Sequence, residues 1–450
     1  MKLDDNRMRS PLYLTLFAAS LTAIGCGDEA TVIDNTVAPV APGDTPNAAG
    51  SGGAPSTAPE APAEPEAPAE PGAPATGTDP LYAMMIQVYT PEDRIVYVHL
   101  TKDLDVSSIE LSQAREFASV ANFAGINGRI LVSSGSEPEI TEYGISNDLA
   151  WTEGRTLSFV SYPLDDNANF YYQYVLNDST AYLPFDATGR VIWNPTSMLI
   201  EGTLTDTSVP PAAPNGMLVS TGGNRNAIQF DGPVQQPFFY GDDLDYGPES
   251  IVAIYDEVTN AEVATVTLPC PGLSMASQDG GYTYYGTWGF PDRALFGLGP
   301  APCIARLTPE RTLDEAWTTN LEAVTGGRAH NNFRALGNGK AIANVLHAEE
   351  LENADFANGY DVDVTDQIGS SGPWWKLWLI DLASMTGAPV EGVTVDIGSG
   401  AQFAVLDGRT FVFLPYEDYG RTKIYEIGAD GVAIERGDTV GDVFKWVKIR

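Results

Sequence analysis

The chain is built from short segments with alternating apolar residues, and these segments recur in groups of four. In one clear group, four segments follow one another between residues 119 and 159, separated by turns rich in Gly, Asn, Asp and Pro. The same order returns nearly position for position between residues 401 and 438. Such alternation is typical of β-strands, and units of four short strands every 40 to 50 residues or so are typical of a β-propeller. The repeat therefore predicts an all-β fold without long helices.

Counting the groups gives the expected number of blades. Six units lie at 119–159, 171–205, 224–268, 271–322, 329–395 and 401–438. Segments at 82–89, 94–100 and 107–111 fit the second, third and fourth strands of another blade, and 443–449 fits its first strand. Joining the two ends would complete seven four-stranded blades, with the C-terminal strand in the N-terminal blade and no exposed sheet edge. Six or eight blades, or a pair of β-sandwiches, are the alternatives.

The start of the chain predicts export and a lipid anchor. A positively charged beginning precedes an apolar stretch from Pro11 to Ile24, which is too short for a permanent membrane span and fits a signal peptide over residues 1–25. The small residues before Cys26 resemble the bacterial lipobox, in which the thiol receives a diacylglycerol, although Ala23 stands where that motif usually has Leu. An ordinary secretory signal with an incidental cysteine is the alternative.

Residues 26–80 are expected to form a tether after the lipidated cysteine. Residues 27–80 hold nine carboxylates, no Lys or Arg, and many Ala and Pro, so they cannot bury enough apolar surface to fold. The propeller would occupy residues 81–450. The anchor would hold it in the cell envelope at the outer membrane, on the periplasmic face or at the cell surface.

The net charge narrows the class of binding partner, and the cysteine content predicts a disulfide. The chain has 60 acidic and 24 basic residues, a net charge of −36, which repels phosphate backbones and argues against a nucleic-acid partner. If Cys26 carries the lipid, only Cys270 and Cys303 are left, and in an oxidising compartment we expect them to form a disulfide. Two free buried thiols, or a cysteine nucleophile, are the alternatives.

Candidate site residues occur at the start of the 329–395 unit. Arg328, His330, Asn332 and Arg334 alternate, and first strands of blades line the central channel of a propeller. We expect these residues to form an anion-binding or catalytic spot in the channel. The alternative is that they satisfy backbone groups there.

An acidic segment further along the same unit is a candidate cation site. Asp361, Asp363 and Asp366 could supply oxygen ligands to Ca²⁺, although their spacing is not that of an EF-hand. A solvated acidic loop is the alternative, and no cofactor is required by the sequence.

Aromatic residues form a third candidate surface. Tyr285, Trp288, Trp374 and Trp375 are expected near loops at one face of the propeller, where they could offer stacking surface to a ligand. Packing in the core of the strands is the alternative.

Several features together resemble a known group of proteins. The lipobox, the Ala/Pro/Glu-rich tether and the strands that begin with Gly-Arg are similar to lipoprotein propellers of myxobacteria. Residues 114–117, 191–198 and 444–448 look more closely like the MxcI-type lipoproteins encoded with siderophore genes. The similarity would cover residues 81–450 and implies an accessory role in ferric siderophore uptake. No site residue is carried over from this family.

Two classes of function stay open. The chain has no serine-hydrolase elbow, phosphate-binding loop or zinc-protease motif, so the main prediction is a non-catalytic module that binds a small ligand such as a siderophore, or an outer-membrane protein. The second is a hydrolase of the propeller lactonase type, with a metal held in the channel by carboxylates and His330.

Overall fold

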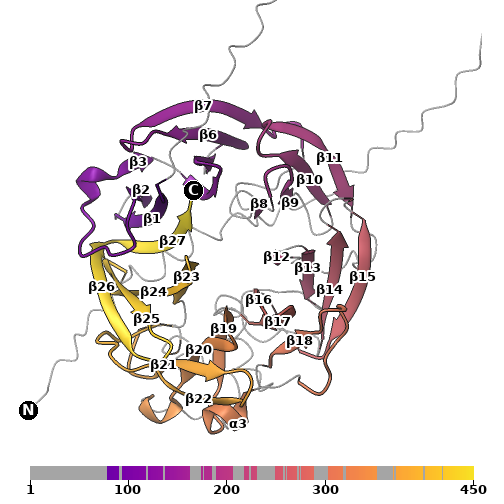
Figure 1. Ribbon diagram of the computed structural model, residues 1–450, viewed down its shortest axis with the longest axis vertical. Coiled ribbons are helices and arrows are strands. Elements are labelled where there is room, and N and C mark those ends of the chain that lie inside the picture. Colours follow the sequence, from indigo (N-terminus) through magenta and orange to yellow (C-terminus); the bar gives the residue numbers. More distant parts are fainter. Residues whose placement is uncertain are drawn as a thin grey trace, which may run out of the picture. The chain divides into compact units, whose positions relative to one another are not determined.

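The chain forms a ring of small antiparallel sheets that follow one another in chain order (Figure 1). The computed structural model describes residues 79–450 except 91–93, 118–119, 135–136, 163–173, 176, 185–188, 206–216, 222–223, 231–248, 257–258, 260, 271–272, 274, 288–302, 318–320, 352–367, 369–370, 399–400 and 418. The predicted signal peptide, Cys26 and all but the last two residues of the predicted tether lie outside these residues. Within the described part there are seven sheets, six with four strands and one with three. The predicted all-β propeller is confirmed.

We number the sheets in chain order and give the strands of each from the axis outward. Sheet 1 contains β27 (Asp442–Lys448), β1 (Tyr82–Tyr89), β2 (Arg94–Thr101) and β3 (Arg115–Phe117). Sheet 2 contains β4 (Val120–Ile126), β5 (Arg129–Ser134), β6 (Glu139–Ile145) and β7 (Trp151–Ser158). Sheet 3 contains β8 (Tyr174–Val175), β9 (Ala181–Pro184), β10 (Gly189–Asn194) and β11 (Leu199–Thr205).

The second half of the ring follows the same order. Sheet 4 contains β12 (Met217–Thr221), β13 (Asn224–Phe230), β14 (Ser250–Asp256) and β15 (Glu262–Leu268). Sheet 5 contains β16 (Met275–Asp279), β17 (Tyr282–Gly286) and β18 (Ala305–Leu307). Sheet 6 contains β19 (His330–Gly337), β20 (Lys340–Leu346), β21 (Trp375–Asp381) and β22 (Thr386–Pro389). Sheet 7 contains β23 (Gln402–Leu406), β24 (Arg409–Tyr416), β25 (Arg421–Ile427) and β26 (Ala433–Val440).

Helices are short in the described residues. They are α3 (Glu322–Thr325) and the 3₁₀ turns η1 (Leu111–Gln113) and η3 (Ala348–Glu350). None of the helices described is both long and apolar enough to cross a bilayer.

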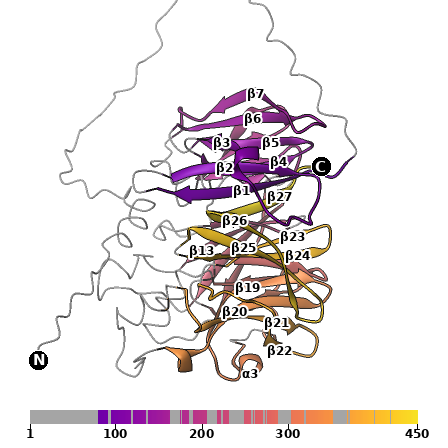
Figure 2. The same cartoon turned by 90° about the vertical axis from the view of Figure 1, so that its left-hand side faces the viewer.

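The two ends of the domain meet in sheet 1, as predicted. β27 pairs antiparallel with β1, with Lys448 opposite Tyr82 and Asp442 opposite Gln87. The two strands lie side by side in both views, although they come from distant parts of the sequence (Figures 1 and 2). Val443 and Trp446 of β27 are buried in one apolar cluster with side chains of sheet 7, so the closing strand also supplies core between the last sheet and the first.

Two predicted strand positions are wrong. The fourth strand of sheet 1 is Arg115–Phe117, which pairs with β2, and not 107–111. Ile109 of that segment and Val106 just before it lie in a loop and are buried in the core between sheets 7 and 1, so their apolar spacing imitates a strand. Sheet 4 begins at Met217 rather than at residue 224, because a further strand precedes the Gly222-Gly223 pair.

The turns between first and second strands repeat one design. Asn127-Gly128, Asn338-Gly339 and Asp407-Gly408 each join two strands, and both residues of each pair have positive φ. Such pairs favour the tight hairpin whose twist matches that of the strands. The next residue is a cation in every case, and it pairs with a carboxylate of the third strand: Arg129 with Glu142, Lys340 with Asp381, and Arg409 with Glu426.

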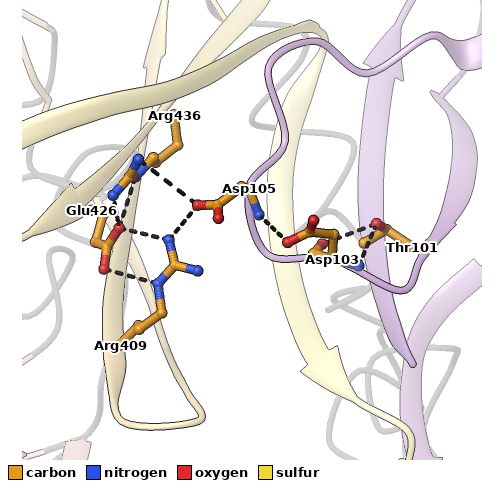
Figure 3. Close-up of polar contacts among 6 residues, drawn as sticks. All are labelled: Thr101, Asp103, Asp105, Arg409, Glu426 and Arg436. Atoms are coloured by element: carbon orange, nitrogen blue, oxygen red, sulfur yellow. Dashed lines mark hydrogen bonds and ion pairs between the residues drawn. The ribbon is translucent and has the colours of Figure 1, made fainter. Parts of the chain in front are cut away.

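Two of these pairs extend to the neighbouring sheet. In sheet 7, Glu426 also binds Arg436 of the fourth strand, and the Arg409 guanidinium donates to Asp105 of sheet 1 at 2.6 Å (Figure 3). Asp105 lies in the loop between β2 and β3, which Thr101 and Asp103 shape through local hydrogen bonds. This network ties the last sheet to the first.

Sheet 2 uses the same arrangement toward sheet 3. Glu142, whose side chain is only 6% exposed, binds Arg129 and Arg155. Arg155 also donates to the carbonyl oxygens of Thr196 and Ser197 in the loop between β10 and β11, at 2.8 and 2.7 Å. In both sheets an arginine of the fourth strand, Arg155 in sheet 2 and Arg436 in sheet 7, reaches the third-to-fourth loop of the next sheet.

The antiparallel order gives the ring two different ends. Turns between first and second strands contact one another across sheets: Gly339 N donates to Asp279 at 2.6 Å, and Lys448 donates to Asp407 at 2.6 Å. We call the end that carries these turns and the third-to-fourth loops the turn end. The opposite loop end carries the second-to-third loops and the connections between sheets.

The predicted disulfide is present. Cys270 follows β15 and Cys303 precedes β18, and their Cα atoms are 5.6 Å apart. Both lie in the apolar cluster between sheets 4 and 5. The bond therefore joins two neighbouring sheets where one of them has only three strands among the described residues.

Candidate functional site

A bulge near the start of β19 decides which polar residues of sheet 6 share a face. Asn332 has a φ of 50°, and the pairing with β20 shifts between Asn331 and Arg334. Asn331 lies opposite Asn344, and Arg334 lies opposite Ile342. Residues two apart on a strand point to the same side. The bulge therefore puts Asn331 and Arg334 on one face of the sheet.

This face is turned toward sheet 7. Ile342 packs in one apolar cluster with Val412 and Leu414 of β24. The Asn344 amide nitrogen donates to the carbonyl oxygen of Gly398, shortly before β23, at 3.4 Å. The three polar side chains of this face form what we call the amide–guanidinium site: Asn331, Arg334 and Asn344.

Arg334 brings a positive charge that is not neutralised within the described residues. Its guanidinium forms no ion pair there, and its Nε is buried without a hydrogen-bond partner. Burial lowers the pKa of Arg334 from its ordinary value. Arg129, Arg306 and Arg409 are by contrast each paired with a carboxylate. A guanidinium in this position favours an anionic ligand, because a carboxylate or phosphate can accept two parallel N–H bonds.

Asn331 adds an amide with both hydrogen-bonding functions available. The side chain is completely buried, and neither its Oδ1 nor its Nδ2 has a partner within the part of the chain that the structure describes. A buried polar group without a partner costs about 1 to 3 kcal/mol. Native proteins hold few such groups, and a ligand-binding role is one of the explanations for keeping one.

The four alternating residues of the prediction do not act together. Arg328 is turned to Glu349 and forms an ion pair with it at 2.7 Å. His330 lies opposite Val345 on the face away from sheet 7. The backbone N–H of Asn332 donates to the carbonyl oxygen of Thr287, the residue after β17, at 3.0 Å. Arg334 lies on the face turned toward sheet 7. The predicted strict alternation is wrong, because the bulge moves the residues that precede it to the opposite face of the sheet.

The aromatic surface is mostly core. Tyr285 is completely buried between sheets 4 and 5, and Trp375 is 2% exposed, with its Nε1 donating to Ile368 O at 2.7 Å. Trp374 is partly buried against the core of sheets 6 and 7. Trp288 lies outside the described residues. The proposed stacking surface is therefore wrong for Tyr285 and Trp375, because these rings fill space between sheets.

The acidic calcium candidate is not described. Asp361, Asp363 and Asp366 all lie outside the described residues. Within the described ones, no group of three or more His, Cys, Asp or Glu side chains is placed to hold a metal ion.

The boundary between sheets 1 and 2 carries a second set of polar residues on inner strands. Lys445 of β27 donates to Phe123 O at 2.7 Å and to Asn122 Oδ1 at 3.0 Å, both on β4. Burial lowers the pKa of Lys445 to about 8 and raises the pKa of Asp442 to about 7. β4 also has a register shift near its start, beside the pair Asn122 and Ser133.

Sequence reasoning missed Asn331, Asn344 and Lys445. Asn331 and Asn332 are adjacent, and an Asn pair at a strand start is a usable signal for a bulge, since Asn tolerates positive φ. Lys445 has no local signal, because its surroundings come from β4, more than 300 residues away.

Comparison with solved structures finds a similar fold. No protein-family model matches the chain, and no curated protein does. Among solved structures, the periplasmic gluconolactonase PpgL of Pseudomonas aeruginosa is 12% identical, with a TM-score of 0.51 over 82% of this chain and 99% of that one. Apo AztD from Citrobacter koseri is 12% identical, with a TM-score of 0.40 over 82% of this chain and 98% of that one. At such low identity the similarity concerns the fold alone.

Proposed function

We propose that this protein is a lipid-anchored propeller of the cell envelope that binds an anionic small molecule without catalysing a reaction. The observation that carries the proposal is the guanidinium of Arg334, which has no counterion among the described residues and lies on the same face as the buried amide of Asn331. The anchor is inferred from the sequence around Cys26.

The chemistry of this site suits a carboxylate. The guanidinium offers charge and paired donors, while an amide can donate to one oxygen and accept from a hydroxyl of the same ligand. The chain is strongly acidic, with a net charge of −36. An anion therefore approaches it against general repulsion, and binding depends on a local cation such as Arg334.

Calorimetric titration with citrate and with inorganic phosphate tests the proposal. We expect wild-type protein to bind at least one of the two, and Arg334→Gln to bind it about 10- to 100-fold more weakly, as for a lost charged hydrogen bond of about 1.5 to 3 kcal/mol. Arg328→Gln is the matched control, because Arg328 is turned away to Glu349. Unchanged binding in Arg334→Gln, or no binding by wild type at millimolar concentration, contradicts the proposal.

The anchor has its own test. Cys26→Ala should abolish incorporation of labelled palmitate and move the protein from the membrane fraction to the soluble fraction. A variant that still fractionates with membranes would show that another segment or partner holds it there.

The resemblance to siderophore-associated lipoproteins narrows the ligand to an anionic ferric chelate. Ferric citrate serves as the probe, with citrate alone as its control. Tighter binding of the ferric complex would support an accessory role in iron uptake, and equal binding would argue against a link to iron.

A propeller hydrolase of the lactonase type is the second candidate, favoured by the fold similarity to the gluconolactonase PpgL. The test is to measure hydrolysis of gluconolactone in a pH-stat, which records the acid that is released. Turnover above the spontaneous rate that is lost in Arg334→Gln would select the enzyme, whereas binding without turnover would select the binding module.

A further inference from the structure

The amide of Asn331 needs two partners of opposite kind. Its side chain is completely buried, and within the described residues neither Oδ1 nor Nδ2 has a hydrogen-bond partner. The oxygen accepts and the nitrogen donates, whichever way the amide is turned. Both atoms lie on one edge of the planar amide. A ligand therefore satisfies Asn331 only if it offers a hydrogen-bond donor directly beside an acceptor.

The neighbouring side chains on this face are engaged elsewhere or apolar. Asn344, opposite Asn331, donates its amide nitrogen to the carbonyl oxygen of Gly398 at 3.4 Å. Toward sheet 6, β23 and the residue before it contribute Phe403 and Ala401 to the apolar cluster between sheets 6 and 7. Apolar walls exclude water and strengthen any hydrogen bond that a ligand makes between them.

Arg334 places positive charge at the more accessible part of the amide–guanidinium site. Its side chain is partly exposed, whereas Asn331 is completely buried. The two residues lie opposite Ile342 and Asn344, two positions apart on β20, so their backbones are about 7 Å apart, at about 3.3 Å per residue. A ligand that bridges them turns its anionic group to Arg334 and an uncharged donor to Asn331. A cationic donor such as an ammonium is disfavoured, because the guanidinium repels it.

We propose, on the basis of the anion-binding function above, that the ligand of this site is a 2-hydroxycarboxylate and that Asn331 recognises its hydroxyl. In such a ligand the hydroxyl lies directly beside a carboxylate oxygen. The hydroxyl donates to Asn331 Oδ1, the carboxylate oxygen accepts from Nδ2, and Arg334 donates to the carboxylate. A carboxylate without the hydroxyl pairs with Arg334 and Nδ2 but leaves Oδ1 buried without a donor, which costs affinity.

Calorimetry with a matched pair of ligands tests the role of the hydroxyl. Tricarballylate is citrate without its hydroxyl and keeps all three carboxylates. Both are titrated into full-length protein without added metal ion. We expect citrate to bind about 5- to 10-fold more tightly than tricarballylate, as for one buried hydrogen bond. Phosphate can carry a hydroxyl but has no carbon chain to span the two residues, and it should bind more weakly than citrate.

Two variants separate the hydroxyl from the charge. Asn331→Leu should lower the affinity for citrate to about that for tricarballylate. The affinity for tricarballylate itself should change little, because the lost N–H bond is offset by removal of the unsatisfied oxygen. Arg334→Gln should weaken both ligands by the same factor. An Asn331 with only a structural role would shift both ligands alike in Asn331→Leu.

Equal affinity for citrate and tricarballylate, with binding still weakened in Arg334→Gln, would overturn the hydroxyl assignment and leave anion binding intact. Phosphate that binds as tightly as citrate would overturn it as well. Absence of binding by citrate and by phosphate would instead contradict the anion-binding function, and the hydroxyl assignment with it. Should Asn331→Leu fail to fold, the comparison of the two ligands on the wild-type protein still decides the matter.

Discussion

The turn end of this ring and the first strand of sheet 6 treat polar residues in opposite ways. At the turn end, turns of two residues are followed by cations that are paired with carboxylates, and arginines link neighbouring sheets. Toward the loop end, the second-to-third connection of sheet 6 is long: β20 ends at Leu346 and β21 begins at Trp375. There the first strand of sheet 6 carries an amide and a guanidinium without such partners among the described residues. The polar groups of the turn end thus link neighbouring sheets, whereas those on the first strand of sheet 6 are the groups that we propose to bind an anion.

The largest expected effect lies in the ion cluster of sheet 2. Glu142→Ala leaves two arginines near a buried position without their carboxylate, and breaking such a pair costs about 3 to 5 kcal/mol. Urea denaturation of the variant should show a loss of this size. Glu139→Ala, on the same strand but with no ion pair among the described residues, should change stability by less than about 0.5 kcal/mol. Equal effects would mean that the turn end owes little to its ion pairs.

Glycine substitutions separate turn geometry from packing. Gly408 has a φ of 76°, and a methyl group there would meet open space, so Gly408→Ala should cost about 1 kcal/mol through backbone strain alone. Gly202 on β11 also has open space but no positive φ. Gly202→Ala should therefore be neutral or stabilise by a few tenths of a kcal/mol, through a less flexible unfolded chain. Thermal unfolding of both variants measures the difference, and a loss of similar size in both would refute the role of the turn.

The amide–guanidinium site should show a trade between stability and binding. Asn331→Leu removes a buried amide that has no partner among the described residues, so we expect unchanged stability or a gain of up to about 1 kcal/mol. The same change should weaken anion binding several-fold. Denaturation and calorimetry on one preparation test both. A variant that loses stability while binding normally would show that Asn331 is structural.

The smallest effect concerns pH. Burial raises the pKa of Asp442 to about 7, so the folded protein holds this proton more tightly than the unfolded chain does. The folded state then loses stability as pH rises from about 4 to 7, and the loss stays above 7. Asp442→Asn should therefore gain stability relative to wild type across that range and none below pH 4. Because the carboxyl is only half-buried, we expect the gain to stay below about 1 kcal/mol. A constant difference from pH 4 to 8 would exclude the titration of Asp442.

Much of the fold could be predicted, and little of the site. The strands of sheets 2, 6 and 7, the closing pair β27–β1 and the disulfide follow from local alternation, turn residues and cysteine count. The prediction of a strand at 107–111 is wrong, because buried loop residues and strand residues can have the same apolar spacing. The prediction that Tyr285 offers a stacking surface is wrong for a related reason, since an aromatic residue beside a loop can pack into the core or face the solvent.

The sequence by itself determined the repeat of strands, the tight Asn-Gly and Asp-Gly turns and the sites of the cations that follow them, because each depends on residues close together in the chain. Only the tertiary structure decided that Asn331 and Arg334 share a face, that Arg328 is paired elsewhere, and that Lys445 meets two acceptors on β4. A single bulged residue reverses the side of its neighbours, and a charge is paired or unpaired according to residues hundreds of positions away. Those contacts exist only after the ring has closed.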